Sequence, residues 1–529
     1  MHLDSANFGL SDKIFYFIPA TIVILISWVK YKGLEHVLIN YRWIFVCLFL
    51  LPISVIYDTL FFIRSKLIFL LNAAPKQHDE RVKHVQKQVR KWVEAGRPSR
   101  MCTARPGWQN ISFRRGKYKS TLTNIEVNLM DILSVDTERK VVRAEPMVSM
   151  GQMTALLNPI GWTLPVLPEL DDLTVGGLIM GVGIESSSHL YGLFQHCCIS
   201  FELVLADGSL VKCSKEENSD LFYAVPWSYG TLGFLVAAEM SIIPAKKYVR
   251  LEYTPLTSRQ QISSLFPATA SSSEKFDFVE TLAYDRDSAV LMTGRLTDDC
   301  EFDKVNAIGR WYKPWFFKHV EGYLLRNKKG VEYIPLRDYY HRHSRSIFWE
   351  LQDIVPFGNN IIFRILCGWM VPPKVSLLKL TQGETIKRLY ENHHMVQDML
   401  VPMDKLNDSL DCFHKHVNLY PLWLCPFVLP NEQGMVHPRS SASSEMYVDI
   451  GAYGEPKVPN YHPRETTRKI EQFVSDCDGF QMLYADSYLT EQEFRKMFDH
   501  NLYDKMRREL DCEKAFPEVY NKVCRAARD

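Results

Sequence analysis

The chain has 529 residues, which is long enough for more than one folded domain. Its 62 Lys and Arg residues nearly balance its 61 Asp and Glu residues, so the net charge is +1. A nucleic-acid-binding protein usually has a basic excess, and we therefore expect no nucleic-acid partner. The 12 cysteines show neither a zinc nor a disulfide pattern, which favours a reducing compartment and predicts no metal site.

Two apolar stretches begin the chain, at residues 14–29 and 43–63. The second is long enough to cross a bilayer, whereas the first is short for a span. A cleaved signal peptide fits the first stretch poorly because acidic residues precede it. A buried hydrophobic hairpin is the other alternative. The basic segment 76–100 follows, and it predicts that the rest of the chain lies on the cytosolic side. We expect a membrane-anchoring segment over residues 1–66, with one span or two.

An amphipathic helix is predicted over residues 81–93. Val82, Val85, Val89 and Trp92 recur at three- and four-residue spacing, with Lys and Arg between them. The helix is expected to dock on the next domain, with a membrane-surface role as the alternative.

The stretch 171–192 is rich in glycine and serine and carries little charge. Its small residues are Gly176, Gly177, Gly181, Gly183, Gly192 and Ser186 to Ser188. Glycine allows backbone amides to approach a ligand without a Cβ in the way, and successive amides form an anion-binding concavity. The stretch therefore predicts a phosphate or pyrophosphate cradle, with a glycine-rich surface loop as the alternative. It contains neither a Walker lysine nor a G-x-G-x-x-G turn, so another architecture is expected.

Other motifs surround this stretch in a fixed order. A turn at residues 105–108 precedes it, an Asp207-Gly208 turn between two strand-like runs follows it, and residues 230–233 form a late glycine turn. This array resembles the FAD-binding domain of the vanillyl-alcohol oxidase and p-cresol methylhydroxylase superfamily.

Four further runs narrow the resemblance. Residues 164–174, 312–317, 341–343 and 347–351 are similar to those of the delta-24-sterol reductase family, and its animal members resemble the chain more than the plant ones. The resemblance implies an α+β fold: a two-subdomain, FAD-binding PCMH-type domain, a mixed α/β substrate cap and an N-terminal hydrophobic membrane segment. The boundaries we expect are 1–66 for the membrane segment, 67–250 for the FAD domain, 251–470 for the cap, and 471–529 for a C-terminal segment that returns to the FAD domain.

The same resemblance implies FAD as the cofactor. Many superfamily members attach FAD through a histidine in the first loop, where this chain has Trp108, so we expect non-covalent FAD. The residues expected to contact it are Arg105, Gly107, Trp108, Thr174, Val175, Gly176, Gly177, Leu178, Ile179, Met180, Gly181, Val182, Gly183, Ile184, Glu185, Ser186, Gly230, Thr231 and Gly233.

The function that the resemblance implies is NADPH-driven reduction of the side-chain double bond of a sterol, at the endoplasmic reticulum membrane. An isolated alkene is not electrophilic, so its reduction needs a proton donor. A carboxyl group in an apolar pocket stays protonated near neutral pH and can donate. Glu185, Asp486 and the phenol of Tyr484 are the candidate acids. Two alternatives remain open: an oxidase of the same fold that uses oxygen, and a non-catalytic sterol-binding membrane protein.

Overall fold

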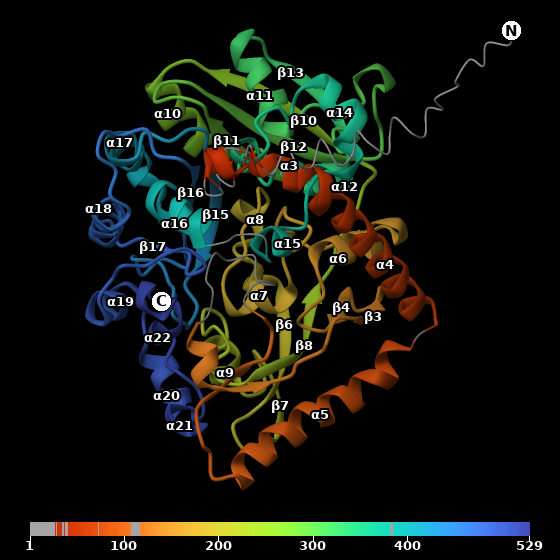
Figure 1. Cartoon of the computed structure of the whole chain (residues 1–529), viewed down its shortest axis with the longest axis vertical. Coiled ribbons are helices and arrows are strands. Elements are labelled where there is room, and N and C mark those ends of the chain that lie inside the picture. Colours follow the sequence, from red (N-terminus) through yellow and green to blue (C-terminus); the bar gives the residue numbers. More distant parts are fainter. Residues whose placement is uncertain are drawn as a thin grey trace, which may run out of the picture.

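The computed structural model describes residues 41–71, 73–106, 117–380 and 384–528, together with residues 27, 29–33, 36 and 37. Two main sheets form the molecule, one below the other in Figure 1, with helices around both. The predicted α+β fold is confirmed.

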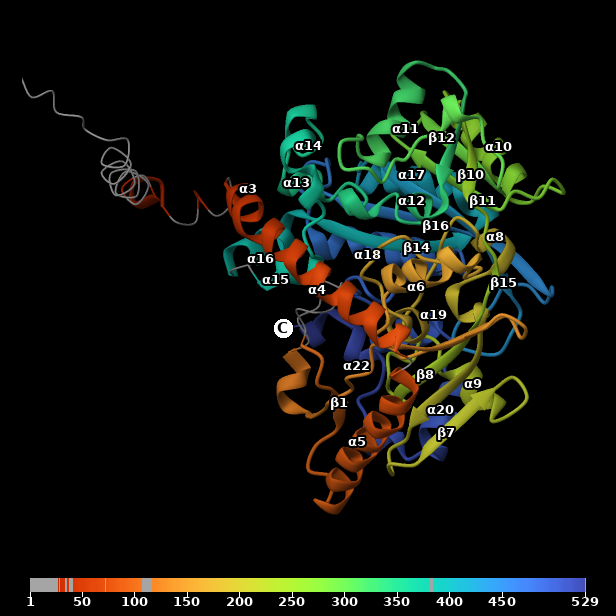
Figure 2. The ribbon, with the colours of Figure 1, turned by 90° about the vertical axis from the view of Figure 1, so that its right-hand side faces the viewer.

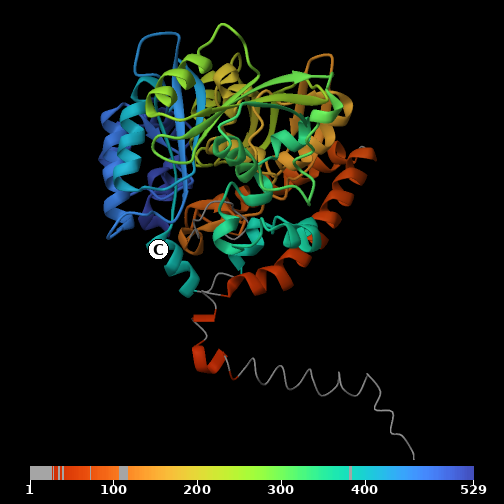
Figure 3. The ribbon, with the colours of Figure 1, turned by 90° about the horizontal axis from the view of Figure 1, so that it is seen from above.

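A long N-terminal helix lies along the side of the molecule. It consists of α3 (Arg42–Phe45), a π-helical stretch η1 (Val46–Leu50) and α4 (Leu51–Leu70). Of the helices in the described part of the chain, this is the one that is long and apolar enough to cross a membrane. Two ion pairs attach this helix to the rest of the molecule. Lys374 Nζ lies 2.8 Å from the carboxylate of Asp58, and Arg64 pairs with Asp131 at 2.7 Å. Figures 2 and 3 both place α4 alongside the body.

The predicted amphipathic helix is confirmed as α5 (Ala74–Glu94), which buries Val82, Val85, Val89 and Trp92. It packs on the N-terminal sheet, whose strand order is β3-β4-β8-β6-β7. The predicted Asp-Gly turn joins β6 and β7, and Gly208 has a φ of +82° there. The bounds of this sheet are β3 (Ile132–Asp136), β4 (Val141–Ala144), β6 (Cys198–Val204), β7 (Leu210–Ser214) and β8 (Phe234–Ser241). Its helices are α6 (Met150–Leu157), α7 (Val175–Met180), α8 (Ser188–Tyr191) and α9 (Ser219–Ala224).

Two small sheets complete this part of the molecule. The parallel pair β1 (Met101–Thr103) and β2 (Thr123–Ile125) lies beside the N-terminal sheet, and β5 (Trp162–Thr163) pairs with β9 (Ile243–Pro244).

The cap sheet has eight strands in the order β13-β10-β12-β11-β15-β16-β14-β17. Side chains alternate along its strands, so that Val448, Ile450 and Ala452 join an outer core while Tyr447 and Tyr453 face the N-terminal domain. The strands are β10 (Tyr248–Leu256), β11 (Phe278–Ala283), β12 (Ala289–Thr297), β13 (Gly330–Pro335), β14 (Met395–Pro402), β15 (Leu422–Pro430), β16 (Ser444–Gly454) and β17 (Phe480–Gln481).

Helices cover the outer face of the cap sheet and fill the connection between β13 and β14. The outer helices are α10 (Arg259–Ala270), α17 (Leu406–His416) and α18 (Pro463–Asp476). The insertion contains α12 (Leu336–Tyr340), α13 (Leu351–Ile354), α14 (Ile361–Cys367), η8 (Gly368–Met370), α15 (Val375–Leu380) and α16 (Glu384–His393), and α11 (Phe316–Leu325) lies in the preceding connection, between β12 and β13. Of these, α15 contacts η1, and η8 contacts α4.

The C-terminal segment divides between the two sheets. Strand β17 pairs with β14 at the edge of the cap sheet. The later helices α19 (Glu491–Met497), α20 (Asn501–Glu509), α21 (Cys512–Ala515) and α22 (Tyr520–Val523) follow it. Of these, α20 packs on α9 of the N-terminal domain, where the Tyr503 hydroxyl lies 2.7 Å from that of Thr231.

Candidate active site

A cavity of about 670 Å³, with a mostly apolar wall, lies between the N-terminal domain and the cap sheet. Its size and polarity are typical of a small-molecule site. It collects most of the residues predicted to hold the cofactor. Those that line it are Arg105, Thr174, Gly176, Gly177, Leu178, Met180, Gly181, Val182, Gly183, Ile184, Gly230 and Gly233.

The other predicted cofactor residues lie elsewhere. Val175 and Ile179 are buried on the core side of α7, and Ser186 is buried against Tyr339. Thr231 is buried under α20. Gly107 and Trp108 lie outside the described residues.

The glycine stretch presents free backbone amides to the cavity. The amides of Gly177, Val182, Gly183 and Ile184 donate to no acceptor among the described residues. The first amides of a helix lack intrahelical partners, which applies to Gly177 in the first turn of α7. Such a cluster of unpaired donors is suited to an anionic ligand.

Two glycines leave room for that ligand. A Cβ at Gly177 would meet only Thr174 Oγ1, at 3.1 Å, among the described atoms within 4 Å. A Cβ at Gly230, whose φ is +68°, would meet nothing described nearer than 3.8 Å. Gly183 has a different role, because its Cβ would lie 2.8 Å from Phe194 and 2.9 Å from Leu178. Glycine at position 183 therefore allows close packing against Phe194 and Leu178. Glycine at position 177 instead leaves space for a ligand to approach the backbone amides.

Basic side chains add positive charge to the same part of the cavity. Arg105, Lys119 and Lys522 line it, and Lys119 Nζ donates to the carbonyl of Thr103 at 2.9 Å. Burial lowers the pKa of the Lys119 ammonium and that of the Arg105 guanidinium. An anionic group in the cavity would offset this unfavourable burial.

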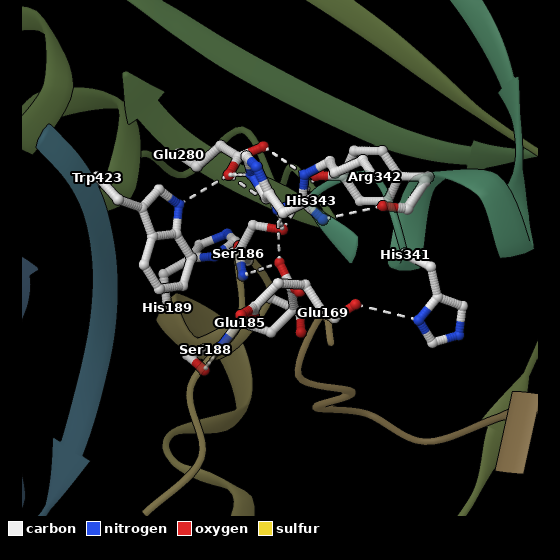
Figure 4. A network of polar contacts seen from close by, with 12 residues as sticks. Glu169, Glu185, Ser186, Ser188, His189, Glu280, His341, Arg342, His343 and Trp423 are labelled. Carbon is white, nitrogen blue, oxygen red and sulfur yellow. Dashed lines mark hydrogen bonds and ion pairs between the residues drawn. The ribbon is translucent and has the colours of Figure 1, made fainter. Parts of the chain in front are cut away.

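The predicted acid Glu185 belongs to a buried ion-pair network (Figure 4). Arg342 Nη2 donates to Glu185 at 2.7 Å, and Arg342 Nε donates to Glu280 at 2.8 Å. The Trp423 indole also donates to Glu280, at 2.9 Å. Burial opposes the charge on Arg342, but the carboxylates of Glu185 and Glu280 outweigh it and raise the pKa of Arg342. Glu185 does not line the cavity, and its carboxylate joins the glycine stretch to the cap.

The predicted acid Tyr484 lines the cavity and donates its hydroxyl hydrogen bond to Asp398. Asp398 also lines the cavity and accepts from Tyr453. Burial raises the pKa of Asp398 to about 6, although the two tyrosine hydrogen bonds act in the opposite direction. Burial and the charge of Asp398 raise the pKa of the neighbouring Asp449.

Strand register explains this carboxyl cluster. Asp398 of β14 pairs with Gly451 of β16, between Asp449 and Tyr453 on the same face. A Cβ at Gly451 would lie 2.8 Å from the Asp398 carboxylate. Sequence reasoning missed Asp398; the available signal was a single carboxylate inside a strand, residues 395–402, that is apolar apart from Asp398 and Gln397.

Asp486, the third predicted acid, does not line the cavity. Its carboxylate lies 3.8 Å from Arg525 Nε, and its carbonyl accepts a hydrogen bond from Gln397 at 2.8 Å.

Comparison with known proteins agrees with this site. A family described as "FAD binding domain" matches residues 80–214. "Delta(24)-sterol reductase" from Rattus norvegicus is 62% identical over 506 residues, 96% of this chain and 98% of that protein. The chain belongs to the delta(24)-sterol reductase family. A Caenorhabditis elegans homologue is 48% identical over 511 residues (94% of this chain, 97% of that protein), and the Arabidopsis thaliana reductase is 40% identical over 533 residues (94% and 92%).

The residues of this site fit FAD. The open space at Gly177 and Gly230 and the unpaired amides would accommodate a pyrophosphate, and the nearby cations would neutralise it. The predicted FAD-binding domain and the predicted family are both confirmed. The stronger similarity to the animal reductases is also confirmed.

Proposed function

We propose that this chain reduces the double bond between carbons 24 and 25 of a sterol side chain, with NADPH as the electron donor and non-covalently bound FAD as the carrier. The observation that carries the proposal is full-length similarity to named sterol reductases together with a cavity that combines a pyrophosphate cradle and buried acids. FAD supplies two-electron chemistry, and its reduced form can donate a hydride.

The proton is the part of the reaction that this chain's own residues must supply. Protonation of carbon 24 gives tertiary cation character at carbon 25, where the hydride completes the reduction. Asp398 is the proposed donor, because burial holds its pKa at about 6 and it lines the cavity. Tyr484 and Tyr453 donate hydrogen bonds that orient the Asp398 carboxyl, and burial raises the pKa of the neighbouring Asp449.

The other sequence-predicted acids take other roles in this proposal. Glu185 positions the glycine stretch through its ion pair with Arg342. Tyr484 donates a hydrogen bond to the proposed proton donor, Asp398. The apolar aromatic wall around Phe348 and Trp423 excludes water and tolerates the developing positive charge.

We also propose that the protein binds a membrane. This membrane is that of the endoplasmic reticulum, and the catalytic body lies on its cytosolic side. One face of the N-terminal helix carries exposed apolar side chains at three- and four-residue spacing: Phe45, Phe49, Ile53, Ile56, Leu60, Ile63, Leu67 and Leu70. Ser54 and Asp58 on its opposite face bind Lys374, and Arg64 at the flank of the apolar face pairs with Asp131. Helix α14, in the same part of the molecule in Figure 2, exposes Ile361, Ile362, Ile365 and Leu366. An apolar surface of this extent is suited to lipid.

An anaerobic assay tests the proposed function. Purified holoenzyme, NADPH and a sterol with a 24,25 double bond are incubated without oxygen, and NADPH oxidation and product are measured together. We expect one NADPH consumed for each double bond reduced. A requirement for oxygen would indicate an oxidase, and a protein that purifies without flavin would indicate a sterol-binding protein.

A further inference from the structure

A second polar group lies in the cavity wall, apart from the glycine stretch. Arg42 of α3 lines the cavity and is only 8% exposed. Its Nη1 donates to the hydroxyl of Tyr390 on α16 at 2.9 Å, but its Nε and Nη2 have no hydrogen-bond partner among the described residues. A buried guanidinium with unused donors is unfavourable unless a ligand accepts from it.

An unused acceptor lies in the same part of the wall. Glu350 lines the cavity, and its Oε2 lies 2.6 Å from His394 Nε2. Its Oε1 is buried without a partner among the described residues. The His394 ring is 4.8 Å from that of Tyr390, so Arg42, Tyr390, His394 and Glu350 form one continuous group.

The charges of this group favour a neutral ligand over a phosphate. Glu350 and Asp353 both lie beside Tyr390. Burial and the charge of Glu350 raise the pKa of Asp353 to about 6, and at His394 burial is outweighed by the charge and hydrogen bond of Glu350, so that the pKa of His394 is raised as well. The cationic side chains Arg42 and His394 are therefore already matched by two carboxyl groups, which leaves no excess positive charge within this group for a phosphate to neutralise. An alcohol is the small neutral group that uses both a donor and an acceptor, because its oxygen accepts from a guanidinium while its hydrogen is donated to a carboxylate.

Most of the wall near this group is apolar, apart from Lys379 of α15. Ile354 of α13 and Val375 and Leu378 of α15 line the same cavity. A ligand that fits this wall therefore has an apolar body with one hydroxyl group. A sterol has this structure, with its hydroxyl at the opposite end of the molecule from the side chain.

We propose that Arg42 and Glu350 form a subsite that binds the hydroxyl group of the substrate and so selects hydroxylated sterols. This inference rests on the proposed function for the identity of the substrate. The subsite holds the sterol by its ring end, while the Asp398 cluster acts on its side chain.

Binding measurements test the subsite without requiring turnover. Full-length holoenzyme is titrated with two sterols that have saturated side chains, one with a 3β-hydroxyl and one with hydrogen at that position, and tryptophan fluorescence is followed. We expect the wild-type protein to bind the hydroxylated sterol about 10- to 100-fold more tightly, as for hydrogen bonds to charged groups. Arg42→Leu should abolish this preference, and Glu350→Gln should weaken it, while affinity for the deoxy sterol stays unchanged.

Arg388→Leu is the matched control, because Arg388 is an exposed residue of the same helix as Tyr390 and does not line the cavity. It should retain the wild-type preference. Equal affinity of the wild-type protein for the two sterols would overturn the subsite whatever the variants do. A rise in the NADPH KM for flavin reduction in Arg42→Leu would also overturn it, because it would assign the guanidinium to a nucleotide phosphate. Loss of turnover with an intact hydroxyl preference would contradict only the proposed function.

Discussion

Glu185 of the glycine stretch and Arg342 of the insertion form a fully buried ion pair, with 2.7 Å between Oε1 and Nη2. Arg342 also binds Glu280 of β11, so one guanidinium connects the N-terminal domain with the cap sheet. Disrupting a buried pair leaves an uncompensated charge, which typically costs about 3–5 kcal/mol.

Arg342→Met should therefore lower the free energy of unfolding by about that amount and weaken retention of FAD. Thermal unfolding and the flavin-to-protein ratio after gel filtration measure the two effects. Arg250→Met is the control, because its partner Glu252 is 41% exposed and such a pair contributes little. Similar melting temperatures for the two variants would contradict the role of Arg342.

Gly177→Val should yield a folded protein that does not bind FAD. The Cβ of the new side chain would meet only Thr174 among the described atoms within 4 Å, so the valine methyl groups should extend into the space proposed for the pyrophosphate. Circular dichroism checks folding and the visible absorption spectrum checks flavin. Gly181→Val is less informative, because its Cβ would lie 2.8 Å from the carbonyl of Gly177 and would disturb the backbone itself. A yellow Gly177→Val protein would refute the cradle.

The sterol step should slow as pH rises through about 6, since Asp398 must be protonated to donate and burial raises its pKa to that value. Asp398→Asn should lower the rate of sterol reduction by about 10²–10⁴-fold. Reduction of the flavin by NADPH should be nearly unchanged, because that step needs no alkene protonation. Stopped-flow absorbance separates the two steps. If Tyr484→Phe abolishes the sterol step and Asp398→Asn does not, the phenol is the donor.

Exchanging two apolar side chains of α14 for charged ones should weaken contact with lipid. Ile362 and Leu366 are 66% and 65% exposed, so Ile362→Glu with Leu366→Glu leaves the core unchanged. Hydrogen exchange of residues 361–367 should slow in the presence of phosphatidylcholine vesicles for the wild-type protein but not for this variant. Leu265→Glu on α10, which lies away from α14 in Figures 1 and 2, should behave as wild type. Slow exchange that depends on protein concentration and not on vesicles would assign the surface to a second copy of the chain.

Local patterns in the sequence were sufficient to predict α5, the hairpin between β6 and β7, and the glycine-rich wall of the cavity. These features depend on short-range periodicity, on a turn dipeptide or on a cluster of glycines. The pairing of Glu185 with Arg342 spans 157 residues, and that of Asp398 with Tyr484 spans 86. Both depend on how the cap sheet packs on the N-terminal domain, which no local pattern specifies.

The placement of labelled hydrogen tests the proposed reaction most directly. Reduced holoenzyme is prepared with NADPH carrying deuterium at the transferred position, mixed without oxygen with a sterol that has a 24,25 double bond, and the product is analysed by NMR. A parallel reaction uses unlabelled NADPH in deuterated water. We expect deuterium from NADPH at carbon 25 and solvent deuterium at carbon 24. Deuterium from NADPH at carbon 24, or a product that forms only with oxygen, would contradict the proposed reaction.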